Sequence, residues 1–132
     1  MASNRPTTAE LLTAVREFLD GDVREAVAAS DVNFKLNIAL NVLRLVEREV
    51  ELGPRYEQAE VLELQQLLSS EETSVAKLNE ALCRRIREGV YDEEGSAREL
   101  LLRHLRSATL NKLAIDNPSY STFRSLAGDN DN

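Results

Sequence analysis

The sequence predicts an all-α protein, a single-domain antiparallel helical bundle of about five helices. Three observations support this fold class. Hydrophobic residues recur every three to four positions, no stretch alternates with the period of two that is typical of a strand, and Gly and Pro number only five and three. Short polar links between the helical stretches favour up-and-down neighbours. We expect a flexible N-terminus at residues 1–6, a helical bundle domain at 7–118 and a C-terminal tail at 119–132 that is partly disordered, from Gly128 to Asn132.

The longest helical pattern covers residues 33–52 and is followed by Gly53 and Pro54, a pair that is typical of a helix end. At about 1.5 Å per residue it predicts a helix of roughly 30 Å. When residues are placed at steps of about 100°, the hydrophobic side chains fill more than half of the helix surface, so we expect this helix at the centre of the core. Leu40 is the only large hydrophobic residue on the opposite, polar strip. The hydrophobic arc contains Phe34, Leu36, Ile38, Ala39, Val42, Leu43, Leu45, Val46, Val50 and Leu52.

Capping residues and hydrophobic spacing predict the other helices. A first helix begins at the capping box Thr7–Glu10 and is interrupted at residues 20–22. Pro54 suits the first turn of a new helix, because its missing N–H has no partner there. A polar loop is expected at residues 69–73, and Ser74 or Thr73 can cap the helix that follows it and ends at Gly89. The last helix covers about residues 97–115.

Composition and charge exclude several classes of function. The net charge of −7 argues against binding to nucleic acid or to an anionic membrane, because both need an excess of Lys and Arg. No run approaches the roughly 18 apolar residues of a membrane span. Cys83 is the only cysteine and fits a reducing compartment. We therefore expect a soluble cytoplasmic protein.

Motifs that carry catalysis are missing from the sequence. It has no GxxxxGK, GxGxxG, HExxH, CxxC or GxSxG, and its single histidine, His104, is expected on the solvent-exposed side of the last helix. We therefore expect no catalytic residues, no metal site and no cofactor.

One hypothesis concerns a polar group in the core. Glu49 falls within the hydrophobic arc, and Lys112 falls in the middle of the inner face of the last helix. Because a buried carboxylate needs a cation or a proton, we expect the two to meet, with Asn79 and Tyr56 as further members of a polar core network. Such a network would either fix the register of the helices or hold a ligand.

Arginines form a second candidate site. Arg84, Arg87, Arg103 and Arg106 belong to a cluster on the last two long helices, where a nucleotide or coenzyme A could bind through its phosphates. The other interpretation is a solvated face with i,i+4 ion pairs such as Glu80–Arg84, and it fits the sequence better.

Several strings of the sequence carry a resemblance: RPTTAELLTAVREFL, NIALNVLRLVEREVELG, KLNEALCRRIREG and LNKLAIDNPSYS. Over roughly residues 5 to 120 the chain resembles a family of small bacterial all-helical domains of unknown function, often encoded beside aminoglycoside-phosphotransferase-like kinases and acyl-CoA dehydrogenases. Ser121 stands where that family usually has an apolar residue. The matching residues are Asn41, Arg48, Glu49, Gly53, Asn79, Arg87, Gly89, Lys112, Asn117, Pro118 and Tyr120.

The resemblance implies, by association, a non-catalytic accessory or protein-interaction module for a phosphotransferase-like kinase or an acyl-CoA pathway. The alternative is a protein that binds a small molecule, acyl-CoA or a nucleotide, at Glu49 and Lys112. An interaction module should expose a hydrophobic stripe, for example on the Val61–Leu68 helix, and a homodimer could form through such a stripe. A ligand-binding protein should instead enclose a pocket.

Overall fold

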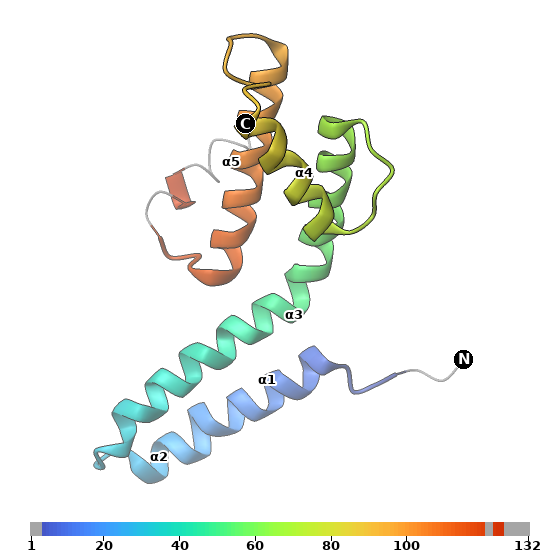
Figure 1. Ribbon diagram of the computed structural model, residues 1–132. Coiled ribbons are helices and arrows are strands. Elements are labelled where there is room, and N and C mark those ends of the chain that lie inside the picture. The colour runs from blue at the N-terminus through green and yellow to red at the C-terminus, as the bar shows by residue number, and fades with distance from the viewer. Residues whose placement is uncertain (1–3, 121–122, 126–132) are drawn as a thin grey trace. The chain divides into compact units, whose positions relative to one another are not determined.

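The computed structural model describes residues 4–120 and 123–125, and in this part of the chain the secondary structure is helical, without strands. The predicted all-α fold class is confirmed. The helices are α1 (Thr8–Phe18), α2 (Arg24–Val27), α3 (Val32–Leu68), α4 (Val75–Arg87) and α5 (Ser96–Asp116), and a π-helical segment, Leu19–Val23, joins α1 to α2 (Figure 1). The residues group into two compact units, Met1–Gly53 and Pro54–Asn132, which are described one at a time below.

The boundaries expected after residue 6 and after residue 118, at the two ends of the bundle domain, stay predictions. The disorder expected from Gly128 to Asn132 concerns residues outside the described part of the chain.

The expected break at Gly53 and Pro54 is wrong, because α3 continues through both residues to Leu68. Glycine ends a helix by adopting a left-handed conformation, as Gly89 does at φ +80° after α4. Gly53 has no positive φ and remains in the helix. Proline inside a helix costs about 3 kcal/mol, and packing along a 37-residue helix can outweigh that cost.

The first unit is an antiparallel hairpin of α1 and the first part of α3. The Thr7 hydroxyl accepts a hydrogen bond from the Glu10 N–H and so caps α1, as the capping box predicted. Further along, Arg16 Nε donates to Glu47 Oε1 at 2.6 Å, and Arg44 donates to Asp20 Oδ2 at 3.2 Å. Arg16 of α1 thus pairs with the later residue of α3 and Asp20 of the π-helical segment with the earlier one, as in an antiparallel hairpin.

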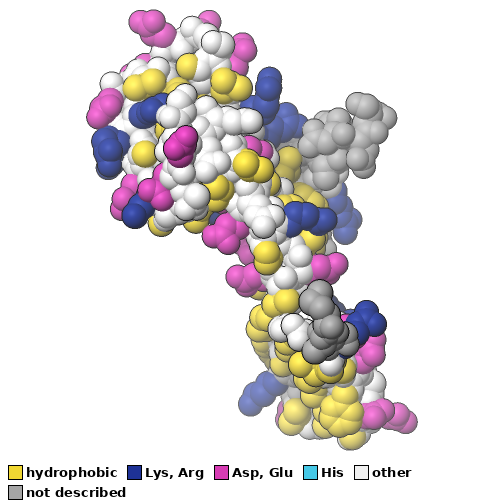
Figure 2. Space-filling view, turned by 90° about the vertical axis from the view of Figure 1, so that its right-hand side faces the viewer, with side chains coloured by type: hydrophobic (Ala, Val, Ile, Leu, Met, Phe, Trp, Pro, Cys, Tyr) yellow, Lys and Arg dark blue, Asp and Glu magenta, His cyan; other side chains and the backbone are white. Residues whose placement is uncertain are grey.

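The side of α3 that faces α1 differs from the predicted one. The side chains that bond to the preceding helices lie on the strip predicted to be polar and exposed, and Leu40 on that strip is fully buried. The predicted core arc instead leaves Phe34, Ile38 and Val42 exposed. Figure 2 shows hydrophobic side chains gathered at its lower end, over α1 and the first part of α3. Arg16 of α1 and Asp20 of the π-helical segment give the polar strip its charged partners, Glu47 and Arg44.

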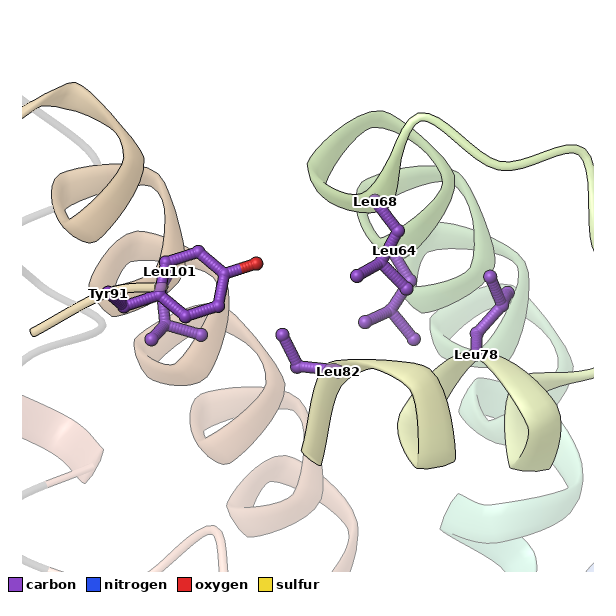
Figure 3. Packing of buried hydrophobic residues seen from close by; sticks show 6 residues of the cluster. All are labelled: Leu64, Leu68, Leu78, Leu82, Tyr91 and Leu101. Carbon is purple, nitrogen blue, oxygen red and sulfur yellow. The ribbon is translucent and has the colours of Figure 1, made fainter. Parts of the chain in front are cut away.

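The second unit has a core of six side chains from the second part of α3, α4, the following loop and α5 (Figure 3). The Ser74 hydroxyl accepts a hydrogen bond from the Lys77 N–H and so caps α4, which crosses the end of α3 (Figure 1). Along α3 and α5, Tyr56 shares a cleft with Leu110, and Leu67 shares a hollow with Leu100, so these two helices run antiparallel. The core residues are Leu64, Leu68, Leu78, Leu82, Tyr91 and Leu101.

Among the described residues, no helix combines the length and the hydropathy that crossing a bilayer requires.

Candidate functional site: a polar cleft between α3 and α5

A cluster of three polar side chains joins α3 to α5. The His104 ring is only 6% exposed, and its Nδ1 lies 2.7 Å from Glu63 Oε2. The Ser107 hydroxyl donates to the other carboxylate oxygen of Glu63 at 3.1 Å. Because an ionised carboxylate only accepts hydrogen bonds, Nδ1 must carry the hydrogen of its bond. The expectation that His104 is exposed to solvent is therefore wrong.

The sequence contained a signal for this position. His104 follows Leu101 by three residues and precedes Ala108 by four, so it lies on the same inner stripe of α5 as these two residues. A buried imidazole needs a hydrogen-bond partner, and a carboxylate on a neighbouring helix satisfies it. Glu63 was missed as that partner because spacing within one helix carries no information about which residue lies opposite.

The order of the three groups bears on the chemistry they can do. In a serine–histidine–acid triad the imidazole lies between the hydroxyl and the carboxylate and removes the hydroxyl proton. Here the carboxylate of Glu63 lies between Ser107 and His104. The cluster therefore fastens α5 to α3 and does not activate Ser107 through His104.

Beside this cluster lies a cleft of about 520 Å³, which we call the arginine cleft. At about 100° per residue, its α5 residues project from one side of that helix. Tyr56 of α3 and Phe123 complete the walls. The α5 lining consists of Arg103, Arg106, Ser107, Leu110, Asn111 and Ala114. A smaller hollow of about 340 Å³ adjoins Glu63 and His104, and Arg103 lines it as well.

The structure brings together some of the predicted site residues. Arg103 and Arg106 of the predicted arginine cluster line the arginine cleft together with Tyr56 of the predicted polar network. Arg84 and Arg87 are exposed on α4 and are not among the residues of the cleft.

The other members of the predicted polar network lie in different surroundings. Asn79 donates a hydrogen bond to Glu60 Oε1 at 3.3 Å and does not line the cleft. Glu49 and Lys112 are both exposed, so the expectation that they point into the core is wrong. Glu49 belongs to the first unit and Lys112 to the second, and a pairing between them stays a prediction. Part of the arc that was expected to surround Glu49 is exposed as well, namely Phe34, Ile38 and Val42.

Potential metal ligands do not gather in the described part of the chain, where no group of three or more His, Cys, Asp or Glu side chains could hold an ion.

The fold and the cleft define a small all-α domain. By comparison with protein-family models, the chain belongs to a family named for a domain of unknown function, DUF6285, whose model matches residues 25–120. The resemblance to small helical domains of unknown function is thereby confirmed. Searches of curated proteins and of solved structures find no match. The matched span contains α3, α4 and α5 with most of the arginine cleft, but it omits α1 and Phe123.

Proposed function

We propose that the protein is a non-catalytic accessory module that binds another protein through α3. The observation that carries this proposal is a hydrophobic stripe in the first unit, made of Phe34, Ile38 and Val42, which are 72%, 50% and 55% exposed. We call it the α3 stripe.

The geometry of the α3 stripe suits a partner helix. Its residues follow one another at intervals of four, so they lie on one side of the helix. On the same helical wheel, Leu36, Leu40, Arg44 and Glu47 point the opposite way, towards α1. Exposed large hydrophobic side chains in a row, rather than scattered singly, are typical of protein interaction sites. An amphipathic helix of a partner could cover this stripe with its own apolar residues.

The family resemblance suggests the first partner to test, a phosphotransferase-like kinase. A cytoplasmic location is part of the proposal and is supported by the free thiol of Cys83, which fits a reducing compartment. The alternative function, binding of an acyl-CoA or a nucleotide at Glu49 and Lys112, has less support because both side chains are exposed.

The test is co-purification of the full chain with the phosphotransferase-like kinase. The double variant Phe34→Ser/Ile38→Ser removes most of the α3 stripe, and Leu102→Ser, at a 55% exposed site on α5, is the matched control. The double variant lacks two hydrophobic side chains that the kinase would bury, so its affinity for the kinase should be at least about tenfold weaker. The control should bind like the original chain.

Equal binding by the double variant, or equal loss in the control, would contradict the proposal. Sedimentation of the chain alone identifies the other possible occupant, since a dimer that dissociates in the double variant would mean that a second copy covers the stripe.

A further inference from the structure

We propose that the arginine cleft binds a small organic phosphate, a phosphate ester whose phosphate group lies against Arg103 and Arg106. This binding site is independent of the proposed protein interaction, because none of its residues belongs to the α3 stripe.

The two guanidinium groups are available for an anion. Arg103 and Arg106 are three residues apart on one side of α5, and among the described residues neither forms an ion pair. Both guanidinium groups therefore keep their N–H donors free of a carboxylate partner in the described part of the chain. The sequence of α5 itself contains four Arg and Lys against two Asp and Glu. The helix is therefore locally basic, and its two clustered arginines face a hollow.

Glu63 lines the adjoining hollow together with Arg103 but forms no ion pair with Arg103 or Arg106. Glu63 accepts hydrogen bonds from Ser107 and His104, one on each oxygen. Both carboxylate oxygens thus already have hydrogen-bond donors from α5. The planar guanidinium group presents paired N–H donors that match two phosphate oxygens, and two such groups side by side fit a doubly charged phosphate.

The remaining walls indicate an organic phosphate. Asn111 supplies an uncharged amide, while Tyr56, Leu110, Ala114 and Phe123 supply aromatic and aliphatic surface. Inorganic phosphate would leave this apolar wall uncovered. The volume of about 520 Å³ lies within the roughly 300–1,000 Å³ that is usual for small-molecule pockets.

The experiment is calorimetric titration of the full chain with two probes, inorganic pyrophosphate and adenosine diphosphate. We expect adenosine diphosphate to bind more tightly, because only its nucleoside part can cover the apolar wall. Each of Arg103→Gln and Arg106→Gln should weaken its binding at least about tenfold, since each removes charged hydrogen bonds. Added salt should weaken the binding of both probes to the original chain.

Arg84→Gln is the matched control, because Arg84 is an exposed arginine on α4 outside the cleft. It should change the affinity less than about twofold, within the small effect expected of a surface charge. Circular dichroism of each variant verifies that it is folded.

Three results would overturn the proposal: no binding of either probe at millimolar concentration, unchanged binding in both cleft variants, or an equal loss in Arg84→Gln. Binding of pyrophosphate with exclusion of adenosine diphosphate would overturn the assignment to an organic phosphate. None of these results bears on co-purification with the kinase, so the two proposals fail separately.

Discussion

Replacing Tyr91 by Phe should stabilise the second unit, although most substitutions in a core destabilise. Tyr91 is 7% exposed, and its hydroxyl is buried with no hydrogen-bond partner among the described residues. Figure 3 shows the ring beside Leu101 with the hydroxyl directed towards Leu64 and Leu68, which offer only hydrocarbon. The hydroxyl thus loses its hydration on folding and gains nothing in return.

The magnitude follows from the desolvation of one hydroxyl group. A buried polar group without a partner costs about 1–3 kcal/mol. Phe keeps the ring and its packing but removes that group, leaving a space smaller than a methyl group. We therefore expect Tyr91→Phe to raise the free energy of unfolding by about 1–2 kcal/mol.

Urea unfolding followed by circular dichroism measures this change as a higher midpoint with an unchanged slope. Tyr120→Phe is the matched control, because Tyr120 is an exposed tyrosine, and it should alter the free energy of unfolding by less than about 0.5 kcal/mol. If Tyr91→Phe lowered the stability instead, the hydroxyl would have a partner in solution and the reasoning would be refuted.

Four further changes test the helices by the same urea measurement. Gly53→Ala should stabilise by about 0.5–1 kcal/mol, because Gly53 is helical and a Cβ there would meet Glu49 Cγ at an ordinary 3.7 Å. Gly89→Ala should destabilise by about 1–2 kcal/mol, because Gly89 has φ +80° and its Cβ would lie 2.8 Å from Asp92 Oδ2; equal effects at both glycines would contradict this. Leu64→Ala should cost about 2–5 kcal/mol because Leu64 is fully buried, whereas the exposed Leu62 should tolerate Ala. The hydrogen bond from Arg24, helped by the charges of Arg24, Arg44 and Arg16 and opposed by desolvation, lowers the pKa of Asp20 from its ordinary value of 3.8. Because the folded-state pKa is depressed, Asp20 stabilises the fold above its unfolded-state pKa, and this contribution is lost as the pH falls through the folded-state pKa. Asp20→Asn should therefore be less stable than the original chain at neutral pH and equally stable in acid, and a difference that persists in acid would refute the electrostatic explanation.

The sequence predicted the helices better than it predicted their ends. Periodicity located α1, α4 and α5, and the side chains of Thr7 and Ser74 located two helix starts through their capping hydrogen bonds. The predicted end of the central helix was wrong because Gly53 and Pro54 affect only the backbone conformation of the nearest residues. Their preference amounts to a few kcal/mol, which the packing of the surrounding helix overrides.

The candidate site could be predicted in part. Arg103 and Arg106 were predicted as members of an arginine cluster on the last two long helices, and their three-residue spacing on α5 gives them a shared direction. Glu63 and Tyr56 on α3 could be placed opposite them only once the antiparallel packing of α3 and α5 was known. His104 was placed on the wrong side because a polar residue type outweighed its spacing from Leu101. The spacing of a polar residue from hydrophobic neighbours predicts its burial better than its residue type does when a hydrogen-bond partner is available in the interior.

The hydrophobic arc of α3 was expected to lie in the core, yet Phe34, Ile38 and Val42 of this arc are exposed and α1 covers a different side of the helix. An arc wider than half of a helix cannot be covered by one neighbour, which contacts only one sector. In the hairpin, the covered sector carries the buried Leu40 and the charged pairs Arg16–Glu47 and Arg44–Asp20. The remaining sector is the α3 stripe. It lies within the span that the family model matches, whereas α1 lies outside that span. A partner common to this family would therefore bind α3 rather than α1, which makes Phe34 and Ile38 the sharper positions at which to test the interaction.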